Sequence, residues 1–312
     1  MNTKNGREAD SNQGGLVFFL QRFGTDEACR EFLEAKRWPK GVTCPRCEAT
    51  KVYKLEGETT RKGLYKCAMC RKPFTVTVGT IFESSHIPLP KWFAAIYLMC
   101  SSKKGVSAHQ IHRQLVVTYK SAWFMCHRIR EAMRNPSFRR TLSGTVQVDE
   151  AYIGGKTRIG KRGKASERKT PVAALISRTQ ARTRVVSHVN AKELHGFIKD
   201  HVKKDATIVT DDASGYSGIT KHYHGGHQRV VHSRGEYVNK LGFTTNTAES
   251  FFALLKRGVR GTFHHVSKDH LARYCTEFEF RWNNRKATDT DRTFAALNWF
   301  HGKRLMYRDA LS

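Results

Sequence analysis

The chain has 312 residues, of which 55 are Lys or Arg and 27 are Asp or Glu, so its formal net charge is +28. This length allows two domains and a small extra module. Such an excess of cations fits a polyanionic partner, because neutralising phosphates releases their counterions. No stretch approaches the ~20 apolar residues of a membrane-spanning helix, and no secretory signal pattern opens the chain. We expect a cytoplasmic, nucleoid-associated protein that binds nucleic acid.

The N-terminal region is predicted to be polar at first and then helical. Residues 1–15 are rich in polar side chains, and we expect disorder there. A short helical segment follows over residues 16–43, in which Thr25 is the expected N-cap of the second helix. The Trp38-Pro39 step ends this helix.

The cysteines indicate metal binding in a reducing compartment and not a disulfide framework. Four of the eight form two CxxC pairs separated by nineteen residues: Cys44, Cys47, Cys67 and Cys70. Two such knuckles are typical of a four-thiolate structural zinc site. With short strands expected between them, residues 44–80 are predicted to form a zinc ribbon whose Zn²⁺ supplies folding energy. Coincidental pairs or a redox dithiol are the alternative.

Residues 88–135 are predicted to be helical. The apolar run Trp92–Cys100 predicts a core helix, since nine residues are too few to span a bilayer. Two further helices, Ser107–Leu115 and Lys120–Met133, flank a tight turn, as in a DNA-binding helix-turn-helix. A plain helical hairpin would give the same pattern, and the two interpretations weigh about equally. The DNA contacts expected from this region are Lys120 and Arg128.

Residues 141–290 show the element order of a ribonuclease-H-like domain. The pattern predicts three strands, a helix and a further strand, over residues 145–153, 171–178, 183–189, 191–202 and 207–210. Three antiparallel strands followed by a helix and a strand that carries an acid are the basis of this prediction. The fold class is therefore predicted to be α/β (α+β). A C-terminal helical tail is expected over residues 291–312.

Asp149 is the residue around which we predict the active site. Apolar side chains alternate up to it, as in a half-buried strand, where an unpaired acid is costly. Asp211 ends a second apolar strand, and Glu249 stands near the start of a helix. Carboxylates on two strand ends and one helix can converge to hold hard cations, Mg²⁺ or Mn²⁺. Two such ions would activate the attacking oxygen and stabilise the leaving oxygen of a phosphodiester displacement.

Two neighbouring acids and one lysine are weighed against this set. Strand alternation aims Glu150 at the opposite face from Asp149. Asp212 is harder to dismiss, and Asp211 is preferred because it directly ends the strand. Lys256 lies two helical turns beyond Glu249, so it shares a face with that acid and could reach a DNA phosphate. An ordinary solvated helix lysine is the alternative.

Basic residues near the predicted site are candidates for phosphate contacts. A Gly-rich cationic loop over residues 156–164 follows the first acid directly. It could be a plain solvated loop, but its position favours a grip on phosphates. The expected contacts are Lys161, Arg162, Lys164, Lys256, Arg257 and Arg260.

Three histidines, His222, His224 and His227, have a spacing that could suit a transition metal. No cysteine or acid completes a site, so a polar glycine-containing loop is the favoured interpretation.

With these motifs in view, the chain resembles bacterial insertion-sequence transposases of the ISXO-like group. These carry an N-terminal zinc ribbon before a DDE-type catalytic domain. The matching motifs run in order over roughly residues 16 to 287, and the main ones are Cys44–Cys47, Val148–Gly155, Thr210-Asp211, His232–Tyr237, Asn246–Phe252, Lys256–Val266 and Arg281–Arg285.

The resemblance implies a ribonuclease-H-like fold, with Asp149 and Asp211 as metal ligands. It also implies binding to the terminal inverted repeats of the element and to target DNA, and action as at least a dimer on paired ends. The third metal position is Asn or Glu in this group. We choose Glu249 over Asn246, because an anionic oxygen suits a hard metal better and the spacing to Lys256 fits the DDE pattern.

Two other functions compete with a transposase that cuts and joins DNA. One is a DNA-binding regulator built from the ribbon and the helix-turn-helix, with an inactive transposase domain behind them. The other is a metal-dependent nuclease that cuts without joining. Three acids in matching contexts argue against decay of the catalytic domain.

Overall fold

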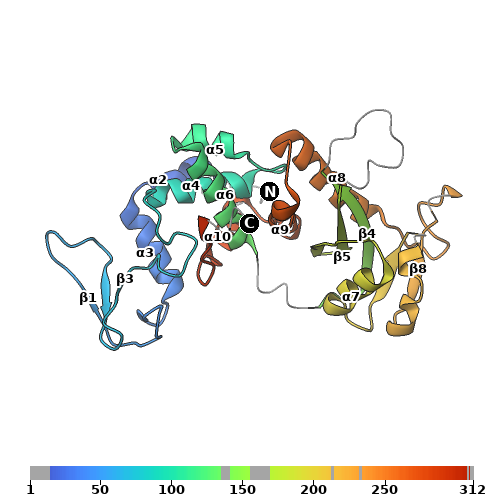
Figure 1. Cartoon of the computed structure of the whole chain (residues 1–312), viewed down its shortest axis with the longest axis horizontal. Helices are drawn as coiled ribbons and strands as arrows, with labels where there is room; N and C mark the ends of the chain where they lie inside the picture. The colour runs from blue at the N-terminus through green and yellow to red at the C-terminus, as the bar shows by residue number, and fades with distance from the viewer. Residues whose placement is uncertain are drawn as a thin grey trace, which may run out of the picture. The chain divides into compact units, whose positions relative to one another are not determined.

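The computed structural model describes residues 15–134, 141–154, 169–211, 214–231, 234–307 and 309. The polar start and the cationic loop over 156–164 lie outside these residues. The chain forms two compact units, Met1–Met133 together with Lys286–Ser312, and Arg134–Arg285 (Figure 1). The second unit corresponds closely to the predicted catalytic region. In the described part of the chain no helix is long and apolar enough to cross a membrane.

An aromatic core holds the helices of the first unit together. Phe294 contributes to it from the C-terminal end of the chain, with its ring 5.5 Å from that of Phe32 and 6.2 Å from those of Phe19 and Phe23. Interleaved rings bury much apolar area and so supply much of the stability. The helices concerned are α2 (Leu16–Arg22), α3 (Asp26–Arg37), α4 (Leu89–Ser101) and α10 (Asp289–Leu297).

Polar contacts also fix the helices and the C-terminal end of this unit. Thr25 accepts the Ala28 amide at 3.2 Å, so the predicted N-cap of α3 is confirmed. Asp26 accepts the amide of Leu89 at 2.7 Å and thereby caps α4. Beyond α10, the Phe300 carbonyl accepts the Ile81 amide at 3.2 Å. The expected tail over 291–312 is therefore an integral part of the first unit, because its apolar side chains complete a core that the N-terminal helices leave open.

A helical hairpin is present where the helix-turn-helix was predicted. Helix α5 (Ala108–Leu115) starts at Ser107, whose hydroxyl accepts the Gln110 amide at 3.2 Å, and α6 (Tyr119–Met133) follows. The turn places Val116 in the left-handed region at φ 50°. The second half of α6 is buried nearly all round, from Met125 to Met133. Only its N-terminal part therefore has side chains available to a partner.

The zinc-ribbon segment forms the predicted short strands. The three-stranded antiparallel sheet has the order β1 (Val52–Lys54), β2 (Tyr65–Cys67) and β3 (Pro73–Phe74). Trp38, Tyr65 and Phe74 form an aromatic cluster with centroid separations of 5.7 to 6.0 Å. The Tyr65 hydroxyl also donates to Glu34 at 3.1 Å. The ribbon is thus attached to the end of α3.

The second unit is built on a mixed five-stranded sheet with the order β6-β5-β4-β7-β8. Strands β4 to β6 are antiparallel neighbours, whereas β7 pairs in parallel with β4, and β8 in parallel with β7. This order and these directions are those of a ribonuclease-H-like fold, as predicted. The strands are β4 (Thr145–Ile153), β5 (Thr170–Ile176), β6 (Ala181–Val185), β7 (Thr207–Thr210) and β8 (His227–Arg229).

Helices cover both faces of this sheet (Figure 1). Val146 and Val148 of β4 pack with α7 (Ala191–His201) on one face. Ala151 and Ile153, on the other face, pack with α8 (Asn246–Gly258), its π-helical continuation η6 (Val259–Phe263) and α9 (Lys268–Asn283). Strand β5, which lies between β6 and β4, is buried on both faces from Pro171 to Ile176, which explains its apolar sequence over these residues.

Candidate active site and metal centre

The sheet register brings two of the predicted acids side by side. In the parallel β4–β7 pair, Gln147 lies opposite Val209. Two residues further along the chain stand Asp149, within β4, and Asp211, directly after β7. Continued by two residues, the register brings these two acids to neighbouring positions, and the Asp211 charge accordingly raises the pKa of Asp149. Since side chains two apart share a face of a strand, Asp149 faces α8 like Gln147 and Ala151.

A hydrogen bond from the strand fixes the helix that carries the third acid. The Ala248 amide, in the first turn of α8, donates to Oε1 of Gln147 at 3.0 Å. The N-cap residue of this helix, Thr245, makes no side-chain cap of its own. The same amide also donates to the Thr245 carbonyl at 3.0 Å, so Gln147 adds a second acceptor and ties the first turn of α8 to β4. Glu249 lies in this turn.

Gln147 is a residue that the sequence analysis did not single out. The available signal was a polar side chain within an apolar alternation, one strand period before the acid. Such a residue on the buried face of a strand needs a partner. Here the partner is the start of the acid-bearing helix.

The acids are close enough to influence one another's ionisation. Burial raises the pKa of Asp149 to about 7, and repulsion from Glu150, Asp211 and Glu249 adds to the shift. The Glu150 amide, which donates to Oδ1 of Asp149 at 2.8 Å, opposes it. A hard cation would neutralise the mutual repulsion of these carboxylates. Their oxygen atoms are ligands that suit Mg²⁺ or Mn²⁺.

Glu150 points to the opposite face, as strand alternation predicts. The hydroxyl of Tyr216, a fully buried residue of η3 (Ser214–Tyr216), donates to the Glu150 carboxylate. Burial, with the neighbouring Glu150 charge, raises the pKa of Tyr216 and so keeps this hydroxyl a donor. Asp212, the other acid weighed, lies outside the described residues.

Both candidates for the third position start the same helix. Asn246 and Glu249 are exposed residues three apart in α8, so they share one side of its first turn. The Glu249 carboxylate is close enough to Asp149 to raise its pKa, but a neutral Asn246 would exert no such repulsion at any distance, so the choice of Glu249 stays a prediction. Asn246 stays the alternative, because it lies on the same side of the helix.

The four ribbon cysteines form a gathered cluster. The sulfur atoms of Cys44 and Cys70 are 3.7 Å apart, and those of Cys47 and Cys67 are 3.5 Å apart. A tetrahedral zinc site with Zn–S bonds of ~2.3 Å has S–S edges of about 3.8 Å. The backbone amide of Cys70 lowers the pKa of Cys67 to about 7, which favours the thiolate there, whereas the hydrogen bond with Cys67 raises the pKa of Cys47. The cluster therefore fits zinc in both geometry and donor chemistry.

Among the residues the structure describes, a ready-made group of three or more metal-ligating side chains is found only at these cysteines. The acids are near one another without being gathered around one point. The three histidines form no such group either. His227 contacts the Thr210 hydroxyl at 2.8 Å, and burial lowers its pKa to about 4, in keeping with a structural role.

The basic candidates have different environments. Lys256, Arg257 and Arg260 are exposed on α8 and η6, and Lys120 is exposed near the start of α6. The Lys120 amine also lies 4.6 Å from the centre of the Tyr307 ring. Three further candidates, Lys161, Arg162 and Lys164, lie outside the described residues.

The prediction that Arg128 contacts DNA is wrong. Its side chain is buried, with 5% exposure, and its guanidinium donates to the carbonyls of Ile81, Glu83 and Leu305 at 2.8 to 3.0 Å. The guanidinium is thus engaged inside the first unit. Its role is to donate hydrogen bonds to backbone carbonyls. The sequence could not predict this role, because the carbonyls belong to residues outside the helix.

A ribonuclease-H-like domain in a chain that also carries a zinc ribbon is the architecture expected of the transposase class indicated by the sequence. Comparisons with known proteins agree. Residues 141–283 match the model of the ISXO2-like transposase domain, and residues 24–73 match the transposase zinc-ribbon domain. The chain belongs to the ISXO2-like transposases.

One relative and two solved structures illustrate the similarity. An uncharacterized protein in transposable element ISH50 of Halobacterium salinarum is 30% identical over 283 residues, covering 84% of this chain and 92% of the relative. The Mos1 transposase paired-end complex with left transposon end has a TM-score of 0.26 at 10% identity, covering 64% of this chain and 78% of that one. A pre-cleavage Mos1 transpososome has 0.24 at 12%, covering 64% and 75%. At these TM-scores, the fold assignment comes from the strand order and not from the overlay.

Proposed function

We propose that this protein is a DNA transposase that binds the terminal inverted repeats of its element and catalyses metal-dependent strand cleavage and strand transfer into target DNA. The observation that carries the proposal is the parallel β4–β7 register, which sets Asp149 beside Asp211, together with the Gln147 bond that ties the first turn of α8 to the same strand.

Asp149, Asp211 and Glu249 would hold the divalent cations. Bound there, Mg²⁺ or Mn²⁺ would supply activation of a water or 3′ hydroxyl and neutralisation of the leaving oxygen. The burial that raises the pKa of Asp149 excludes water from one side of the site and strengthens its electrostatic interactions. Lys256, two turns further along α8, would bind a phosphate of the DNA strand that is cut at the acids.

The remaining parts would position the DNA. Zn²⁺ held by Cys44, Cys47, Cys67 and Cys70 would keep the ribbon folded, and the net charge of +28 would draw the duplex to the protein. The exposed start of α6, with Lys120, is the part of the helical hairpin available to DNA. A homo-oligomer would pair two ends, since both ends of an element must be joined to the target.

The test is a cleavage and strand-transfer assay on the element's end DNA with Mg²⁺ or Mn²⁺, with end binding measured in parallel. We expect Asp149→Ala, Asp211→Ala and Glu249→Ala to lose about a thousandfold in rate, on the order of what removing central charge stabilisation costs, while still binding the ends. Asp205→Ala, an exposed acid away from the site, is the matched control.

Other outcomes would redirect the assignment. If Glu249→Ala stays active and Asn246→Ala does not, the third ligand is Asn246. Cleavage without joining would indicate a nuclease. Binding to the ends with no cleavage under any metal would indicate the regulator with an inactive catalytic domain.

A further inference from the structure

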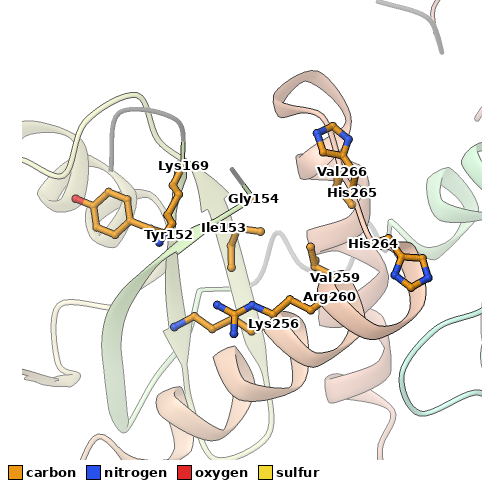
Figure 2. Close-up of a pocket in the computed structure, with 10 residues that line it drawn as sticks. All are labelled: Tyr152, Ile153, Gly154, Lys169, Lys256, Val259, Arg260, His264, His265 and Val266. Atoms are coloured by element: carbon orange, nitrogen blue, oxygen red, sulfur yellow. The ribbon is translucent and has the colours of Figure 1, made fainter. Parts of the chain in front are cut away.

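A cavity of about 300 Å³ opens at the far end of α8 from the acids. It lies between the end of β4, the residue before β5, and the segment that runs from α8 through η6 to Val266. Figure 2 shows its lining: Tyr152, Ile153, Gly154, Lys169, Lys256, Val259, Arg260, His264, His265 and Val266. The acids do not line it.

The cavity and the acids nevertheless lie along the same helix and strand, α8 and β4. Helix α8 runs along β4 in the same direction, because Ala248 is bonded to Gln147 at one end while Lys256 and Ile153 line the cavity at the other. The seven residues from Glu249 to Lys256 span about 10 Å at 1.5 Å per residue. That equals the axial rise of about three stacked base steps at ~3.4 Å each.

The lining is cationic. Lys169, Lys256 and Arg260 all line the cavity, and within the described part of the chain no carboxylate forms an ion pair with any of them. Lys256 and Arg260 are four residues apart, and Figure 2 shows both extending from the helix toward the end of β4. Converging cations of this kind attract a polyanion, and the arginine fork in particular suits phosphate oxygens.

The backbone at the cavity is irregular in two ways. Helix α8 continues into a π-helical turn at Val259–Phe263, and the next residue, His264, has φ 60° and ψ −45°. Single π-turns and non-glycine residues at positive φ are both unfavourable, and both concentrate at functional sites. Here they turn the chain around the cavity mouth, so that Arg260 and His265 line the same space.

We propose that this cavity holds an unpaired nucleotide of a DNA end, with Arg260 and Lys169 on its phosphates, while the scissile bond of the same strand lies at the acids. The inference rests on the proposed function and specifies which part of the substrate is held where. The volume is at the lower end for small-ligand sites. It admits one nucleotide and excludes a base pair with its two backbones.

The experiment compares two DNA probes of equal charge per nucleotide, a blunt duplex and the same duplex with a short single-stranded extension. Binding to the full chain is followed by fluorescence anisotropy as a function of salt, with no divalent cation added beyond the bound zinc. The variants are Arg260→Gln and Lys169→Gln, and Lys199→Gln, an exposed lysine of α7 outside the cavity, is the matched control. Arg260→Lys separates charge from the arginine fork.

We expect the unmodified protein to prefer the extended duplex, and each cavity variant to weaken that binding about tenfold and to lower the salt slope by about one. Binding to the blunt duplex should change little, and Lys199→Gln should behave as the unmodified protein. Equal weakening for both probes, or no weakening, overturns the proposal.

The assay measures binding alone, so it separates this inference from the proposed chemistry. A chain that shows the Arg260-dependent preference but never cuts DNA keeps the cavity and loses the transposase activity. A chain that cuts and joins ends without this preference keeps the activity and loses the cavity. Bound zinc and far-UV circular dichroism of each variant establish that the fold is intact.

Discussion

The two predicted metal sites differ in how the fold assembles them. The ribbon cysteines lie within 27 residues and are already gathered, with sulfur atoms 3.5 to 3.7 Å apart in the two closest pairs. The acids Asp149 and Glu249 are 100 residues apart and meet only through a strand register and one helix tether. The ligands of a local site can be predicted from their spacing in the sequence. The ligands of a long-range site come together only if the intervening part of the domain packs correctly.

The largest expected effect would break the local site. Removing zinc with a chelator should unfold the ribbon, because zinc binding to such modules contributes on the order of 10 kcal/mol that the short strands cannot replace. Amide exchange should rise over β1 to β3 and stay unchanged in the second unit. Cys67→Ser should have the same effect and lose the metal.

Met69→Ser is the matched control for this prediction. It alters an exposed residue of the same knuckle, 72% accessible, and removes no thiolate. A ribbon that stays protected from exchange without metal would show that its aromatic cluster, and not zinc, holds it.

The second prediction tests the scaffold of the long-range site through a buried acid. Glu279 of α9 accepts the backbone amide of Thr183 in β6 at 2.6 Å, and burial raises its pKa to about 7 from an ordinary value of 4.5. The folded state thus favours the protonated acid. Its contribution to stability is fully present below pH 4.5 and is lost as the pH rises through about 7, a change of about 3 kcal/mol at ~1.4 kcal/mol per unit.

Glu279→Gln should remove this dependence, since the amide oxygen still accepts from Thr183 and carries no charge. Amide exchange of α9 and β6 across this pH range measures the difference from the unmodified protein. Asp205→Asn, an exposed acid in the same unit, should leave the slope unchanged. If stability fell with pH equally in Glu279→Gln and in the unmodified protein, the prediction would be contradicted.

Substitution of Gln147 is expected to have the smallest effect on stability and a larger effect on the reaction rate. Gln147→Ala loses one hydrogen bond, worth about 1 kcal/mol. It also frees the first turn of α8, and a shift of about 1 Å in the Glu249 carboxylate costs roughly a hundredfold in rate. We therefore expect turnover to fall much more than stability, with a higher Mg²⁺ requirement and unchanged binding to DNA.

Thr145→Ala, at an exposed position of the same strand, is the control for Gln147. Equal losses in stability and turnover would show that Gln147 acts on the fold alone. A normal Mg²⁺ requirement in Gln147→Ala would show that the helix tether does not position Glu249.

Much of the fold was predictable because its signals are local. The CxxC spacing, the Thr25 cap and the order of strands and helices each depend on neighbouring residues, and each is confirmed. The strand boundaries differ by a few residues, as at β6, which is Ala181–Val185 where 183–189 was expected. The position of Asp149 in a strand follows from alternation alone.

What failed depended on long-range packing. Arg128 was predicted to contact DNA, but its guanidinium donates to three distant carbonyls. The tail was predicted only to be helical, and its part in the N-terminal aromatic core had no local signal. The contacts of Arg285 likewise have no local signal: its guanidinium donates to the carbonyls of Arg178 and Trp282, at 3.0 and 2.8 Å, and lies 4.8 Å from the Trp282 ring centre. Such partners are far away in the sequence or defined only by helix geometry.

The amino-acid sequence by itself determined the chemistry that this protein carries: four thiolates at zinc spacing, one acid within a strand, one directly after a strand and one at a helix start, and a charge suited to DNA. These follow from residue type and short spacing. Only the tertiary structure decided which of these groups meet. The β4–β7 register, the Gln147 tether and the cationic cavity beyond Lys256 arise from contacts between distant segments, whose energies depend on the whole packed domain.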